Sequence, residues 1–189
     1  MQRKIATLAV LALALSVLPV GASTFLAMSD EQLVTQSTAV VRGTVVSVDS
    51  FWNASHTLIV TEVVLEVENT VVGEAPKFVT LRTAGGTVGD YTIEAHGFPT
   101  FQQGERSLLF LSKDIASPAL RVTGYQLGHY RIVTNSNGVD IAVPTLDHNV
   151  RLLSVDGTSV ESPKARPLAL FEASLREQGR KLQRTEDLR

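Results

Sequence analysis

The chain has no cysteine among its 189 residues. This absence excludes disulfide bonds, thiolate zinc sites, a cysteine nucleophile and a lipid-modified cysteine. Without covalent cross-links, the folded state depends on side-chain packing and backbone hydrogen bonds for its stability.

Basic residues are in short supply as well. The chain has 17 lysines and arginines against 19 aspartates and glutamates, and removal of Arg3 and Lys4 with the leader described below leaves a net charge of −4. Binding to nucleic-acid phosphates requires a basic stripe, which this chain lacks. We therefore expect no nucleic-acid partner.

The common catalytic and phosphate-binding motifs are also absent. The sequence contains no His-Glu-x-x-His, no Gly-x-Ser-x-Gly, no P-loop and no calcium loop. The histidines stand singly, mostly beside turns, and their spacing does not predict a metal site. They are His56, His96, His129 and His148. We expect no catalytic residue, no metal and no cofactor.

Residues 1–22 have the order of segments of a secretory signal peptide. Arg3 and Lys4 precede an apolar run over 5–18, and Pro19 and three small or aliphatic residues follow it. The apolar run is shorter than the roughly 20 residues that span a bilayer. We expect a secreted or periplasmic protein with no transmembrane anchor after cleavage.

The predicted cleavage point follows Ala22. Ser23 then becomes the new N-terminus, with Thr24 as the near alternative. The rest of the chain has the length of one domain, so we expect a single β-barrel domain over 23–180 and a polar tail over 181–189.

Helices are predicted near both ends of this domain. Ser29 and Gln32 stand at the spacing of a capping box, which predicts a short helix over 30–36. Pro167, followed by apolar residues at helical spacing, predicts a second helix that ends at Gly179.

Between these helices the sequence is rich in β-branched residues and turn signals. Strands are predicted over 40–48, 57–67, 78–82, 107–111, 120–122, 130–134 and 139–143, with a final hairpin over 152–158. The run 107–111 is apolar throughout, as expected of a strand buried on both faces. Such strands in one small, all-antiparallel domain indicate a mainly β fold, either a closed barrel or a sandwich.

Two loop regions hold the candidate binding residues. Phe51 and Trp52 lie in the turn between the first two strands, either exposed for binding or folded over the open end of a barrel. The glycine-rich segment 83–104 is predicted to be a long loop that is either functional or folded back on the domain. Its candidate binding residues are Gly85, Gly86, Tyr91, Phe98 and Phe101. Gly85-Gly86 indicates a turn or bulge, because no lysine follows it as in a phosphate loop.

The order of these segments resembles the netrin-like module of tissue inhibitors of metalloproteinases. The resemblance covers residues 33–131 and is carried by the segments 37–45, 61–67, 72–73, 79–81 and 104–111. It implies an OB-type barrel with a short N-terminal helix and a C-terminal helix. In that family the mature N-terminus is a cysteine whose amine and carbonyl bind the protease zinc; Ser23-Thr24 stands at that place here.

The chain also resembles a group of small exported bacterial proteins of unknown function. They share the Gly-Gly loop, here Gly85-Gly86, and a Phe-x-x-Gly-Glu turn, here Phe101 to Glu105.

These observations predict an exported, non-enzymatic binding module with an OB-like antiparallel barrel. Such barrels bind through loops across one open end, and we expect a protein partner there. A secreted metalloprotease is one such partner, because the α-amine of Ser23 can lose its proton and bind zinc together with the adjacent carbonyl oxygen. Packing of Phe25 and Leu26 against the barrel is needed to order this segment.

Two other readings stay open. One is a secreted hydrolase whose site is assembled from His96, Asp90 and either Glu94 or Glu105, or from Ser107 beside His96 and Asp90. It requires a carboxylate and an imidazole within about 3 Å of each other in a pocket. The other is a structural accessory protein of the envelope.

Overall fold

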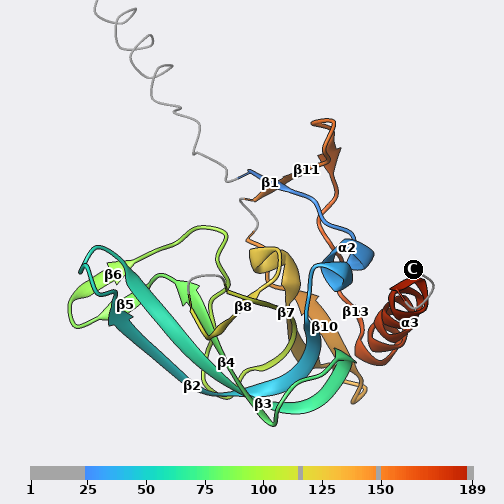
Figure 1. Ribbon diagram of the computed structural model, residues 1–189, viewed down its shortest axis with the longest axis horizontal. Coiled ribbons are helices and arrows are strands. Elements are labelled where there is room, and N and C mark those ends of the chain that lie inside the picture. Colours follow the sequence, from blue (N-terminus) through green and yellow to red (C-terminus); the bar gives the residue numbers. More distant parts are fainter. Residues whose placement is uncertain (1–23, 115–116, 148–149, 187–189) are drawn as a thin grey trace, which may run out of the picture.

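The computed structural model describes residues 24–114, 117–147 and 150–186 (Figure 1). The predicted leader over 1–22, the candidate residue Ser23 and His148 lie outside the described residues.

A closed five-stranded barrel forms the centre of the molecule. In order around the barrel, its strands are β7 (Arg106–Lys113), β2 (Ala39–Trp52), β3 (Ile59–Gly73), β4 (Phe78–Ala84) and β8 (Leu120–Val122). Pairing of β8 with β7 closes the ring. The structure thus confirms the mainly β, barrel-type fold.

One seam of the barrel is parallel. β4 pairs with β8 through Leu81 and Leu120, whereas the other pairs in the ring are antiparallel. The expectation of an all-antiparallel domain was wrong here for a topological reason. Strand direction cannot alternate all the way round a closed ring with an odd number of strands, so one neighbouring pair has to be parallel.

The central strand β7 is buried on both faces, as its sequence predicts. Leu109 and Leu111 belong to the barrel interior, while Leu108 and Phe110 belong to a second core outside it. All four side chains have zero solvent exposure. The outer core is completed by Phe171 of α3 (Leu168–Glu186). β7 therefore joins the barrel to the layer that covers it.

That layer consists of further strands and two helices on one side of the barrel (Figure 1). The sheet continues from β7 through β9 (His129–Thr134), β10 (Asp140–Pro144) and β13 (Arg166–Pro167). A separate small sheet contains β1 (Thr24–Leu26), β11 (Arg151–Leu153) and β12 (Ser159–Val160). The predicted hairpin over 152–158 is confirmed by the β11–β12 pairing.

The short helix α2 (Asp30–Thr35) begins as predicted. Ser29 Oγ accepts the amide of Gln32 at 3.2 Å, and the Gln32 side chain accepts the amide of Ser29 at 2.8 Å, which completes the capping box. Asp30 also forms a bidentate ion pair with Arg166, at 2.7 and 2.9 Å. Through this pair the start of α2 is tied to the strand that precedes α3.

The C-terminal helix is longer than predicted. α3 passes through Gly179 and reaches Glu186, so most of the segment expected as a polar tail is helical. Gly179 does not cap the helix. A β-carbon at this position would lie 2.8 Å from Cγ1 of Val72 on β3, so glycine permits close packing of the helix against the barrel.

Glu172 holds α3 to the barrel through a buried polar cluster. Its side chain is 6% exposed and bonds to Arg42 of β2 at 2.9 Å, to Arg176 at 2.7 Å and to Asn69 of β3 at 3.3 Å. A buried carboxylate requires such partners, because its transfer from water is otherwise costly.

We predict that Glu172→Ala lowers the free energy of unfolding by about 2–3 kcal/mol, because it removes the buried carboxylate that bonds Arg42, Asn69 and Arg176 and leaves Arg42 with Glu68 as its carboxylate partner. Urea unfolding followed by circular dichroism measures the change. Glu177→Ala is the matched control, since Glu177 lies on the same helix but is exposed and pairs with exposed Lys181. Equal midpoints for the two variants would contradict a structural role for the cluster.

Candidate binding site at the open end of the barrel

The hairpin of β2 and β3 reaches beyond the rest of the barrel (Figure 1). β2 pairs with β3 as far as Trp52 and Ile59, but with β7 only as far as Thr44 and Arg106. The projecting end is accompanied by a small hairpin of β5 (Gly86–Val88) and β6 (Tyr91–Ile93). The segment 83–104, predicted as loop, therefore contains the end of β4 and this hairpin.

The two predicted binding regions meet at this end. The rings of Trp52 and Tyr91 are in edge-to-face contact, with centroids 5.8 Å apart, and His56 stacks beside Trp52 at 6.1 Å. Tyr91 is 67% exposed and Phe51 is 38% exposed. We call Trp52 and Tyr91 the aromatic surface. Phe51 precedes Trp52 on an extended strand, so its side chain lies on the opposite face of β2, with the Arg82 guanidinium 5.5 Å from the centre of its ring.

Gly85 and Gly86 bring the chain close to the strands beneath it. A β-carbon on Gly86 would lie 2.4 Å from the hydroxyl oxygens of both Ser50 and Thr61. The Thr61 hydroxyl donates to the carbonyl of Gly85 at 2.7 Å. Both glycines have positive φ, at 88° and 131°, so this approach requires residues without a side chain.

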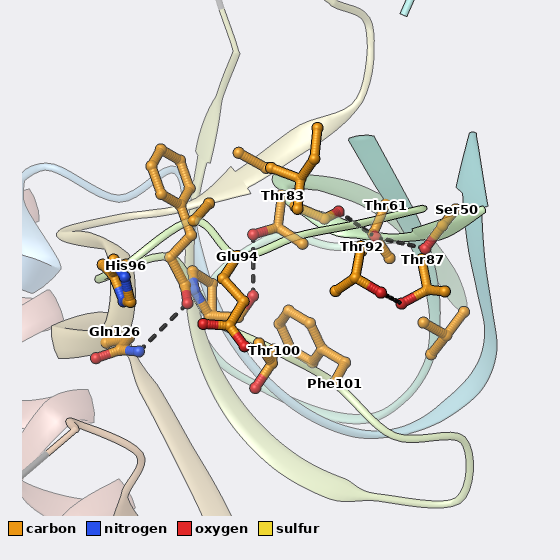
Figure 2. A pocket seen from close by; sticks show the side chains of 18 of the residues that line it. Ser50, Thr61, Thr83, Thr87, Thr92, Glu94, His96, Thr100, Phe101 and Gln126 are labelled. Atoms are coloured by element: carbon orange, nitrogen blue, oxygen red, sulfur yellow. Dashed lines mark hydrogen bonds between the residues drawn. The ribbon is translucent and has the colours of Figure 1, made fainter. Parts of the chain in front are cut away.

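Below these glycines a pocket of about 360 Å³ opens in the mouth of the barrel (Figure 2). Its walls are rich in hydroxyl groups that are hydrogen-bonded within the protein. Ser50 and Thr61 lie 2.8 Å apart, Thr87 and Thr92 lie 2.9 Å apart, and Thr83 donates to the carbonyl of Pro99 at 2.9 Å. We call this the hydroxyl-lined pocket.

Carboxylates supply the charge of the hydroxyl-lined pocket. Glu94 and Asp147 line it together with His96, and among the described residues no lysine or arginine does so. Asp147 is held in place by the buried side chain of Gln126, which donates to Asp147 Oδ2 at 2.9 Å and accepts the Asp147 amide at 3.1 Å. Gln126 also donates to the carbonyl of Phe98 at 3.3 Å.

A second pocket of about 510 Å³ shares one wall with the first. The shared wall contains Phe98 and Pro99 as well as Thr83 and Ala84 of β4. This second pocket is lined by both Arg82 and Arg121, as well as by Asp114. The two pockets therefore differ in their charged residues.

The N-terminal strand supports the shared wall from behind. Phe98 contacts the ring of Tyr125 edge-to-face at 4.8 Å, and Tyr125 lies 6.1 Å from the ring of Phe25 in β1. The Phe25 ring occupies the space in which Gly97 would carry a side chain. Phe25 packs as expected, whereas Leu26 is 62% exposed. Thr24 lies at the start of β1 and is not among the pocket-lining residues.

Phe101 is 8% exposed and closes the inner end of the hydroxyl-lined pocket. Its ring stacks on His129, with centroids 4.6 Å apart. His129 is fully buried, and its Nε2 lies 3.0 Å from Glu105 and 3.1 Å from the Ser107 hydroxyl. Phe101 and Glu105 are the two ends of the Phe-x-x-Gly-Glu turn. Phe101 thus packs on the face of the His129 ring, and Glu105 bonds to a nitrogen at its edge.

The contacts of His129 show that it was wrong to group Ser107 and Glu105 with His96 in a predicted hydrolase site. Ser107 and Glu105 both bond to His129 rather than to His96, and the Ser107 hydroxyl has zero exposure. In a nucleophilic triad the serine and the carboxylate occupy opposite ring nitrogens, whereas here both lie at Nε2. Glu94 and His96 do line the pocket, while Asp90 in the β5–β6 turn does not.

The sequence carried no signal for His129, since its partner Glu105 is 24 residues away. Burial lowers the pKa of His129, against the opposing effect of the Glu105 carboxylate. Burial also opposes ionisation of Glu105, but the hydrogen bonds from His129 and Ser107 and the charge of Arg131 outweigh it and lower the pKa of this carboxyl. Near neutral pH the pair is a carboxylate with a neutral imidazole.

No protein-family model, curated protein or solved structure matches this chain. The netrin-like resemblance therefore stays a prediction based on segment order. Within the described ranges, no helix is long and apolar enough to cross a membrane. In the same residues, no group of three or more histidine, aspartate or glutamate side chains is placed to hold a metal ion.

We predict that the stability of the protein falls as the pH is lowered from 7 to 5. The folded pKa of His129 lies below its ordinary value of 6.5, so the unfolded chain binds a proton in this range that the folded chain excludes. The loss is at most about 1.4 kcal/mol per pH unit.

The variant His129→Gln tests this assignment, because its amide can still donate to Glu105 but does not titrate. We expect a shallower pH dependence for this variant in urea unfolding at pH 5, 6 and 7. His56→Gln, in the exposed β2–β3 loop, should keep the wild-type slope. An unchanged slope in His129→Gln would show that another group causes the acid sensitivity.

Proposed function

We propose that this chain is an exported binding module that captures a protein partner at the open end of its barrel. The observation that carries this proposal is the contact between half-buried Trp52 and exposed Tyr91, which joins the two hairpins into one aromatic surface. The hydroxyl-lined pocket opens beside it: in β5, Gly86 lines the pocket and Val88 pairs with Tyr91.

Several physical features favour binding at this end. Tryptophan and tyrosine are enriched among the few residues that carry most of the energy in protein interfaces, because they bury a large area at a small cost in conformational entropy. The wall formed by Phe98 is supported from behind by Tyr125 and Phe25, so little ordering is needed when a partner binds. The negative net charge of the mature chain also favours a protein over a nucleic acid.

We predict that the double variant Trp52→Ala, Tyr91→Ala weakens partner binding at least about tenfold, through loss of about 1.4 kcal/mol or more of contact energy. The mature protein, immobilised, captures partners from the extracellular or periplasmic fraction of its source. Calorimetry then compares the affinity of the identified partner for each variant.

Phe78→Ala provides the matched control for this experiment. Phe78 is an aromatic residue with 50% exposure, but it lies at the start of β4, whereas the pocket lies at the end of this strand. We expect wild-type affinity for this variant. If the double variant also binds with wild-type affinity, the aromatic surface is not the binding site.

A second candidate function is inhibition of a secreted metalloprotease through the mature N-terminus. This candidate is favoured because the segment that follows Ser23 has a fixed conformation. Thr24, Phe25 and Leu26 pair with β11, and the amide of Ala27 donates to the carbonyl of Leu153 at 2.7 Å. Each ordered residue would otherwise cost on the order of 1 kcal/mol on binding.

For this candidate we predict that mature protein beginning at Ser23 inhibits a secreted zinc protease more strongly than the same protein with one extra N-terminal residue. The extra residue moves the α-amine away from the position at which amine and carbonyl together reach the zinc. Inhibition constants for the two forms provide the measurement. Equal inhibition by both forms would exclude binding of the amine to zinc.

A further inference from the structure

The charge of the hydroxyl-lined pocket indicates which part of a partner it accepts. Its lining contains the carboxylates of Glu94 and Asp147 and the imidazole of His96, and within the described chain it contains no lysine or arginine. Figure 2 shows Glu94 extending into the space between His96 and Thr100. An anionic group entering this pocket would meet two carboxylates and no lysine or arginine.

Two of the wall hydroxyl groups do not offset this charge. Thr61 donates to the carbonyl of Gly85 and Thr83 to the carbonyl of Pro99, so their protons are directed at the backbone. These two groups therefore offer a ligand acceptor oxygen atoms, beside the carboxylates of Glu94 and Asp147 and the ring of Phe98. Carboxylates and aromatic faces are the groups that bind cationic side chains.

The carboxylate of Asp147 is already oriented before a ligand binds. Gln126 is 7% exposed, and its amide makes reciprocal hydrogen bonds with the side chain and the backbone of Asp147. The same amide bonds to the carbonyl of Phe98, so it fixes the aromatic wall and the carboxylate together. A buried amide that orients an exposed carboxylate is a preorganised arrangement.

We propose that the hydroxyl-lined pocket receives a basic side chain, arginine or lysine, from the protein partner. This inference rests on the proposed function and names the chemistry of the partner segment. The cation lies between Glu94 and Asp147, and its aliphatic part lies against Phe98. The second pocket, beyond the Phe98–Pro99 wall, contains Arg82 and Arg121 as well as Asp114, and Arg82 is paired with Glu62 at 2.9 Å, so the proposed cation site is confined to the hydroxyl-lined pocket.

N-acetyl-arginine amide serves as the probe, titrated into nitrogen-15-labelled mature protein and followed by amide chemical shifts. We expect saturable shifts for residues 94–101 and for Gln126, and weaker binding at higher salt. N-acetyl-citrulline amide has nearly the same shape without the charge, and we expect at least about tenfold weaker binding for it. Equal shifts with both compounds would overturn the proposal.

Two variants locate the interaction. Glu94→Gln should reduce the affinity for the arginine probe several-fold, and Glu94→Lys should abolish binding. Asp90→Asn is the matched control, because Asp90 is an exposed carboxylate of the nearby β5–β6 turn that does not line the pocket. Binding that persists in Glu94→Lys would overturn the proposal, provided that the shifts of the barrel core show a folded protein.

The same variants separate this inference from the proposed function. If the captured partner requires Trp52 and Tyr91 but binds Glu94→Lys as well as the wild type, the aromatic surface is the binding site and the basic side chain is ruled out. If the partner binds all variants equally, the proposed function fails. Loss of affinity in both sets supports a basic segment bound across the aromatic surface and the pocket.

Discussion

The unequal pairing of β2 determines the shape of the candidate site. β2 is bonded to β3 along its whole length, but β7 accompanies it only as far as Thr44. The barrel is closed and filled with aliphatic side chains where β7 is present. Beyond that point the inner faces of β2, β3 and β4 would be open to solvent. The segment 85–101 covers them and leaves a pocket rather than a packed core.

The inward-facing residues of these strands change from aliphatic to hydroxyl-bearing towards the open end of the barrel. Inside the closed part, β2, β3 and β4 contribute Val41, Val63 and Leu81 to the core. Towards the open end the same strands contribute Ser50, Thr61 and Thr83. Hydroxyl groups suit a wall that is only partly covered, because they can bond to the backbone of the covering segment and still tolerate water.

The covering segment is held at several points by contacts of different kinds. Gly86 lies directly over two hydroxyl groups, Gly97 lies against the ring of Phe25, and Phe101 stacks on buried His129. The stacking of Phe101 on His129 connects the pocket to Glu105. The carboxylate of Glu105 is shared by the neutral imidazole of His129 and the guanidinium of Arg131. A site supported in this way keeps its shape in the absence of a ligand, which suits binding better than conformational gating.

The sequence alone determined the features that depend on neighbouring residues. The capping box of α2 and the double-sided burial of β7 are each readable from short patterns, because the physical cause lies within a few residues. The aromatic and glycine residues of the candidate site were also identifiable by type. Their meeting at one end of the barrel depended on the barrel itself.

The tertiary structure decided what depends on contacts between distant segments. Glu172 bonds to Arg42 across 130 residues, and Gly179 continues a helix instead of ending it because Val72 packs against it. His129 looked like one more isolated histidine until folding placed it between Phe101 and Glu105. Local patterns record the preferences of a segment, but burial and pairing energies arise only when the segments meet, so the buried polar pairs and the pocket are properties of the folded chain.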